Sequence, residues 1–249
     1  MDFNFKRPSH IFALVILILV LSYLIGSSIY YYFTPLSIST DYTGNFSEVT
    51  RIVFQIILLV VQLLVVLAIF VGVPLLWYFA VNRLSLREML YRMKFRRKGI
   101  DMAALWGFIT AVVMFAIIFA IGIAMTQIGI DTEELGNIED LEQLFSLPAM
   151  FILVAVQPIT EEIFFRGFLL EKIHALAGKE IAIVVTSVLF GVVHLSYGNV
   201  YPALMAGLLG VILAIAVIKT KNLMTSVIAH TLYNIASVAL YVIAKSLLS

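Results

Sequence analysis

Long apolar runs, rather than alternating polar and apolar positions, dominate the hydrophobic pattern of this chain. The runs occupy approximately residues 11–33, 52–81, 103–130, 148–170, 181–197, 201–218 and 223–244. A helix needs roughly 17–25 apolar residues to cross a bilayer, and most of the runs reach that length. β-Strands are not predicted, because an open sheet exposed to lipid leaves backbone groups unsatisfied. The pattern therefore predicts an all-α polytopic transmembrane bundle of about seven spans, with eight as the alternative.

Composition supports the membrane assignment and removes some chemistry. The chain is 62% hydrophobic and only 12% charged, which is too little charge to cover the surface of a soluble domain of 249 residues. It contains no cysteine. A disulfide framework, a thiolate zinc site and a cysteine nucleophile are therefore excluded.

Basic residues concentrate on one side of the predicted bundle. Thirteen of the 16 Lys and Arg residues fall at the N-terminus, in the 82–101 loop, and in the turns at 172–179 and 219–221. The opposite side receives the acidic stretch 131–142. By the positive-inside rule, we expect a multi-pass cell-membrane protein with a cytoplasmic N-terminus and an external C-terminus.

The basic 82–101 loop has two interpretations. It either connects two spans and fixes their orientation, or it forms an interfacial helix whose stripe of Leu86, Leu90 and Met93 lies on anionic headgroups. Both make membrane lipids the expected partner of this loop. Neither implies a nucleic acid.

Ionisable side chains inside the apolar runs are confined to the second half of the chain. They are Glu161, Glu162 and Arg166 in the fourth run, His194 in the fifth and His230 in the seventh, with Asn234 one turn after His230. Each charge near a helix centre costs roughly 2.5–3.5 kcal/mol on insertion, so their gathering favours function over structure. We therefore predict a scaffold of three spans over 1–147, including the basic loop, and a four-helix catalytic part over 148–249.

Helical spacing divides the charges of the fourth run. Glu162 and Arg166 are four residues apart and share a face, so they can form an ion pair. Glu161 lies about 100° around the helix and must face a different neighbour. Pro158 either kinks this helix or begins a new one.

These residue types permit the hydrolysis of an amide without a serine or cysteine nucleophile. A carboxylate and a neutral histidine can together deprotonate a water molecule. A second histidine and an amide can donate hydrogen bonds to a developing oxyanion. Taken singly, the ion pair, each histidine and the asparagine have structural explanations, and an interhelical hydrogen bond is the usual one for a membrane histidine.

The same residues resemble the motifs of a known family. "EEIFFRG" (161–167), "FGVVH" (190–194) and "HTLYN" (230–234) resemble the EExxxR, FxxxH and HxxxN motifs of the CAAX protease and bacteriocin-processing family. This family, also called CPBP or Abi, comprises intramembrane endopeptidases, including the CAAX prenyl endopeptidase. The resemblance covers about residues 148–244, with the motifs in the family's order on separate helices.

The resemblance implies a role for each motif residue. Glu161 and His194 would activate water, His230 and Asn234 would form the oxyanion hole, Glu162 and Arg166 would stabilise the site, and Phe190 would support it. It also implies a glutamate mechanism without a metal, on a peptide or protein substrate that is either a prenylated CAAX-type chain or another membrane-associated peptide. Zinc held by Glu161, Glu162, His194 and His230 is the alternative.

Two other functions remain open. The first is a non-catalytic membrane protein of bacteriocin immunity or partner regulation on the same fold. The second is a proton-coupled transporter, which would also use membrane Glu and His residues. It ranks last because the chain shows no inverted repeat.

Overall fold

The structure of the protein is a computed structural model that describes residues 3–34, 47–129 and 144–248. The helical elements, in chain order, are α1 (Pro8–Phe33), α3 (Glu48–Leu67), η1 (Ala68–Gly72), α4 (Val73–Trp77), η2 (Tyr78–Asn82), α5 (Leu86–Arg92), α6 (Ile100–Gln127), α8 (Leu147–Glu162), η4 (Ile163–Leu169), α9 (Leu170–Ala177), α10 (Lys179–Val193), η5 (His194–Tyr197), α11 (Val200–Thr220) and α12 (Leu223–Leu248). Three of these, η1, η2 and η4, are π-helical, and η5 is a 3-10 helix. The described ranges contain no β-strand. The acidic stretch 131–142 lies outside them.

The predicted number of membrane spans is confirmed. Within the described ranges, seven helical segments are long and apolar enough to cross a membrane. The second span is continuous over Glu48–Asn82 and the fourth over Leu147–Ala177. The protein is thus an all-helical, polytopic bundle.

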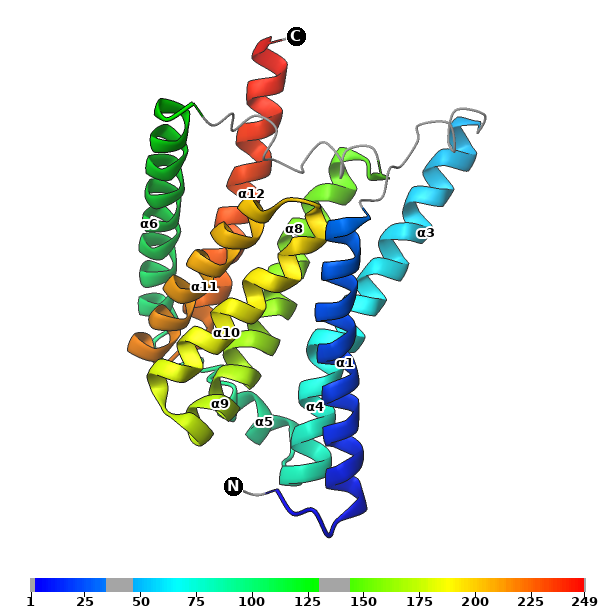
Figure 1. The fold of residues 1–249 in the computed structure, drawn as a ribbon, viewed down its shortest axis with the longest axis vertical. Helices are drawn as coiled ribbons and strands as arrows, with labels where there is room; N and C mark the ends of the chain where they lie inside the picture. The colour runs from blue at the N-terminus through cyan, green and yellow to red at the C-terminus, as the bar shows by residue number, and fades with distance from the viewer. Residues whose placement is uncertain (1–2, 35–46, 130–143, 249) are drawn as a thin grey trace.

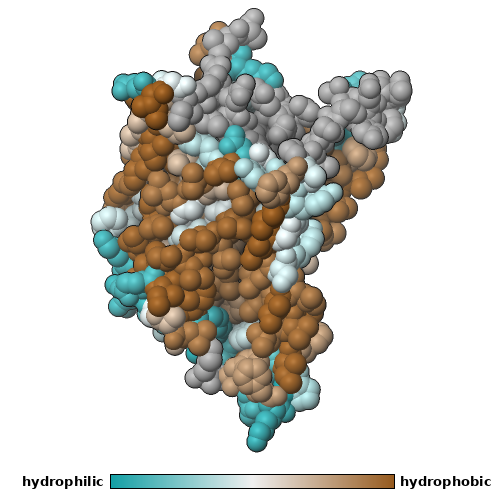
Figure 2. Space-filling view, viewed as in Figure 1, coloured by the Kyte–Doolittle hydropathy of each residue, from teal (hydrophilic) through white to brown (hydrophobic). Residues whose placement is uncertain are grey.

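Four helices occupy the middle of this bundle. Figure 1 shows α8, α10, α11 and α12 in the centre, with α6 on one side and α1 and α3 on the other. Helix α12 packs against both α6 and α8, and α10 packs against α11. The fourth span is the most enclosed, with 44% of its most apolar window buried against 11–17% for the first three. The outer surface in view is broadly hydrophobic, as lipid contact requires (Figure 2).

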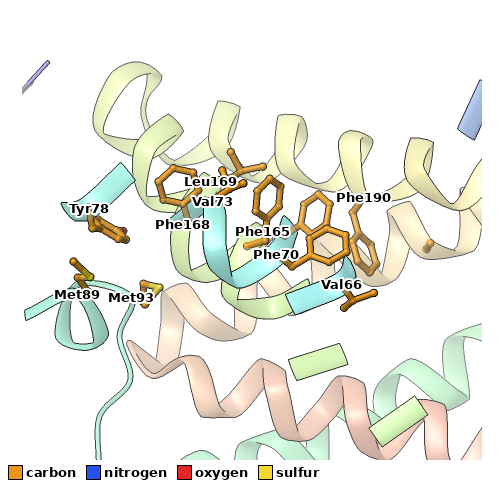
Figure 3. Close-up of a cluster of buried hydrophobic side chains, with 12 residues drawn as sticks. Val66, Phe70, Val73, Tyr78, Met89, Met93, Phe165, Phe168, Leu169 and Phe190 are labelled. Carbon is orange, nitrogen blue, oxygen red and sulfur yellow. The ribbon is translucent and has the colours of Figure 1, made fainter. Parts of the chain in front are cut away.

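An aromatic core ties the predicted scaffold to the central helices. The Phe70 ring of η1 lies 5.4 Å from Phe164 and 6.0 Å from Phe165 of η4. The Phe165 ring in turn meets Phe190 of α10 edge-on at 5.1 Å. Figure 3 shows Phe70, Phe165 and Phe190 gathered in one cluster. Side chains of the second span therefore reach the helices that carry the motifs.

The basic loop contains a short helix, α5, and one of its apolar side chains is buried in the protein core. Ser85 and Glu88 form a capping box at the start of α5, and hydrogen bonds from Ser85 lower the pKa of Glu88. The expected apolar stripe is split, because Met93 is only 1% exposed and belongs to the core. Leu86 and Leu90 stay exposed, at 60% and 38%, and remain available to an interface.

Close approach of α10 and α11 depends on residues without a side chain. A Cβ at Gly191 would lie 2.7 Å from the Ala203 carbonyl oxygen and 3.3 Å from the Gly207 Cα. A Cβ at Gly210 would lie 3.2 Å from the Ser187 Cα. Small residues let membrane helices pack backbone to backbone, and here they fix α10 beside α11.

Candidate active site

The two adjacent glutamates end α8 and differ in their hydrogen bonds within the helix. Both are buried, with Glu161 6% and Glu162 0% exposed. Glu162 Oε1 accepts a hydrogen bond from Arg166 Nη1 at 2.7 Å, so the predicted ion pair is present. Glu161 Oε1 instead accepts from Gln157 Nε2 at 2.8 Å. The predicted Glu162–Arg166 ion pair is confirmed, whereas both glutamates face the same residue of another helix, His230.

Arg166 lies in the π-helical segment η4 and is enclosed on several sides. Its Nη2 donates to the Gly210 carbonyl oxygen at 3.4 Å. Its guanidinium lies 4.2 Å from the centre of the Phe190 ring. Among the described residues, Arg166 Nε and Glu162 Oε2 have no hydrogen-bond partner. The buried pair is therefore only partly satisfied by the protein.

Helix α8 continues through Pro158 rather than beginning there. Proline has no backbone N–H, so the Val154 carbonyl lacks its usual partner four residues on. The π-helical segment begins directly after Glu162. Of the two interpretations of Pro158, a new helix start is therefore excluded.

His230 of α12 lies between the two glutamates. Its Nδ1 is 3.0 Å from Glu162 Oε1, and its Nε2 is 3.9 Å from Glu161 Oε2. In the neutral ring, donation from Nδ1 to the carboxylate leaves Nε2 as an acceptor that faces Glu161. A separation of 3.9 Å is too long for a direct hydrogen bond, so Nε2 and the Glu161 carboxylate face each other without one.

His194 lies at the carboxyl end of α10, where the helix tightens into η5. Its backbone N–H bonds to the carbonyls of Gly191 and Val192, which frees the Phe190 carbonyl. The imidazole Nδ1 donates a hydrogen bond to that oxygen at 2.7 Å, which fixes the orientation of the ring. The Val193 carbonyl accepts from Ser28 of α1 at 3.0 Å and from Ser196 at 3.1 Å. These hydrogen bonds hold the end of α10 around His194.

Phe190 joins these groups into one cluster. Its ring centre lies 4.7 Å from that of His194 and 5.6 Å from that of His230. Glu161, His230 and Arg166 all lie within electrostatic range of His194. Six of the seven predicted site residues are therefore brought together.

Asn234 is the exception. It follows His230 by one turn on α12 and is half-buried. Within the described residues, its amide takes part in no hydrogen bond with the glutamates or histidines. The structure thus puts it on the same helix as His230 without joining it to the cluster.

Two contributors were missed by the sequence analysis. Gln157 precedes Glu161 by four residues, a spacing that could have revealed it. Ser28 has no such signal, because it lies 165 positions from the carbonyl it binds.

In the part of the chain that is described, no group of three or more His, Asp or Glu side chains has the arrangement of a metal site. His230 Nδ1 is already engaged by Glu162.

The fold and this cluster define a class: a multi-pass helical membrane protein with a buried carboxylate–histidine site. Residues 143–236 match the family model described as type II CAAX prenyl endopeptidase Rce1-like, and this stretch contains all seven predicted site residues. The resemblance drawn from the three motifs is thereby confirmed, and the match supports a peptidase. No curated protein and no solved structure matches the chain.

Proposed function

We propose that the protein is an intramembrane endopeptidase that hydrolyses a peptide bond near the cytoplasmic face through a water activated by Glu161 and His194. The main support for this proposal is that the two buried glutamates have different ionic partners. Glu162 is occupied by Arg166 and His230. Glu161 Oε2 instead faces His230 Nε2 at 3.9 Å, and Glu161 also lies within electrostatic range of His194. A carboxylate without a cationic partner in direct contact remains able to take a proton.

The remaining roles follow from the same contacts. Glu162 and Arg166 hold the cluster in place, because their pair anchors η4 to α11 and α12 through Gly210 and His230. His230 presents Nε2 on the Glu161 side, where a protonated ring can donate to an oxyanion. Asn234 lies one turn after His230 on α12 and is the second donor proposed for this oxyanion hole. Phe190 supports both histidine rings.

The activity is tested with purified protein and two peptides, one carrying a farnesylated CAAX end and the other the same sequence without lipid. We expect His194→Ala to reduce the hydrolysis rate about 10²-fold or more, since general-base catalysis contributes 10²–10⁴-fold. His174→Ala is the matched control, because His174 is exposed on α9 and should leave the rate unchanged.

A strong chelator separates the two mechanisms. The glutamate mechanism predicts an unchanged rate, and loss of activity that zinc restores would support the zinc alternative instead. Equal rates for wild type and His194→Ala would overturn the proposed role of His194. Absence of hydrolysis of both peptides would favour the non-catalytic alternative.

We propose further that the N-terminus is cytoplasmic. The turns with basic residues meet at the N-terminal end of the bundle, where Lys172 Nζ lies 3.4 Å from Asn82 and the Leu223 N–H bonds to the Lys94 carbonyl at 3.0 Å. Because the chain has no cysteine, single introduced cysteines report their own side of the membrane.

In intact cells, a membrane-impermeant maleimide should label Arg51→Cys and should label Arg87→Cys only after lysis. Both positions are exposed arginines, so the two variants are matched. Labelling of Arg87→Cys alone in intact cells would reverse the proposed orientation.

A further inference from the structure

A groove between α6 and α11 lies away from the catalytic cluster. It has a volume of about 590 Å³, and none of the site residues lines it. Its walls are apolar and include Met102, Trp106, Ile109 and Ile212. It lies between the start of α6 and the end of α11, on the basic side of the bundle.

Four cationic side chains surround one end of this groove, and no acidic side chain lines it. They are Arg96 and Lys98 before α6, and Lys219 and Lys221 at the end of α11. Figure 2 shows hydrophilic side chains where α11 ends, next to the broad hydrophobic surface. Like charges gathered without a counter-ion repel one another, so this arrangement favours an anion.

Backbone contacts hold the two basic segments together. The Leu223 N–H donates to the Lys94 carbonyl at 3.0 Å, and Asn222 Nδ2 donates to the Arg96 carbonyl at 3.1 Å. Asn222 is 4% exposed and also accepts from the Met224 N–H at the start of α12. Lys221 has a left-handed backbone, with φ of 54°, at the turn between α11 and α12. The cations therefore come from segments more than 100 positions apart and are held beside one groove.

An apolar groove with cations at one end has the features that bind an anionic phospholipid, which carries acyl chains and a negative headgroup. Basic pockets between transmembrane helices bind anionic headgroups, and each cation near the surface contributes about 1 kcal/mol. Trp106 lies along the groove, and tryptophan favours the boundary between headgroups and acyl chains. A zwitterionic lipid would leave the excess positive charge uncompensated.

We propose that this groove binds an anionic phospholipid, with its phosphate among Arg96, Lys98, Lys219 and Lys221 and an acyl chain along α6 and α11. This proposal is independent of the proposed peptidase activity. The bound lipid would bridge the basic 94–98 loop and the end of α11.

Native mass spectrometry of the purified protein tests this, with phosphatidylglycerol and phosphatidylcholine of identical acyl chains as probes. We expect wild type to prefer phosphatidylglycerol and the double variant Lys219→Gln/Lys221→Gln to bind it about tenfold more weakly or worse. The control is Arg87→Gln/Arg97→Gln, which removes two nearby cations that do not line the groove and should change affinity less than threefold. Thermal unfolding in detergent without lipid checks that both variants fold.

Three outcomes would overturn the proposal. Equal binding of the two lipids would remove the anion preference. An equal loss in the control variant would show that binding follows diffuse charge rather than this groove. Competition by the farnesylated peptide against phosphatidylglycerol, lost together with lipid binding in Lys219→Gln/Lys221→Gln, would assign the groove to a lipidated substrate.

Discussion

Glu161→Gln is expected to lower the rate of peptide hydrolysis by about 10²–10⁴-fold, the usual contribution of a general base. The replacement removes the ability of residue 161 to accept a proton but changes its shape little. The amide oxygen of glutamine can still accept the hydrogen bond that Gln157 Nε2 donates at 2.8 Å. Arg166 keeps its ion pair with Glu162, so no buried cation loses its counter-ion.

The expected loss is therefore in kcat, with the unfolding temperature close to that of wild type. Glu180→Gln is the matched control, because Glu180 lies at the start of α10 with its side chain 79% exposed. A folded Glu161→Gln protein as active as Glu180→Gln would remove Glu161 from the mechanism.

Replacing one member of the Glu162–Arg166 pair is expected to destabilise the protein by about 3–5 kcal/mol. Arg166→Met leaves the Glu162 carboxylate buried without its cationic partner, and Glu162→Gln leaves a buried guanidinium without its carboxylate. The double variant Glu162→Gln/Arg166→Met removes both charges. Its loss should be smaller than the sum of the single losses, with a coupling of roughly 0.5–3 kcal/mol.

Unfolding of the four proteins in mixed detergent measures this cycle. The exposed Lys179–Glu180 pair, at 3.2 Å, provides the reference, and its Glu180→Gln variant should lose no more than about 1 kcal/mol. Single losses as small as this reference, or strict additivity in the cycle, would show that the buried pair does not stabilise the site.

The spans were predictable from the sequence because a bilayer imposes a simple rule of length and polarity. The Glu162–Arg166 pair was predictable for a similar reason, since both residues lie on one helix at a fixed interval. The π-helical segments η1, η2 and η4 were not, because no propensity distinguishes them from α-helix over so few residues.

Contacts between helices depend on how each helix is rotated about its own axis, which a single sequence does not reveal. From the sequence, Glu161 was expected to pair with His194, and the family resemblance placed His230 in the oxyanion hole. In the structure, Glu161 contacts Gln157 and His230, and His194 lies within electrostatic range. The proposed roles therefore rest on the shared cluster and stay predictions until activity is measured.

One comparison of rates tests directly whether Glu161 activates water for peptide hydrolysis. Wild type, Glu161→Gln and Glu180→Gln are placed in the same lipid nanodiscs with the farnesylated CAAX peptide, and product formation is followed by mass spectrometry. We expect equal rates for wild type and Glu180→Gln and a rate at least about 10²-fold lower for Glu161→Gln. Equal product formation by all three folded proteins would contradict it.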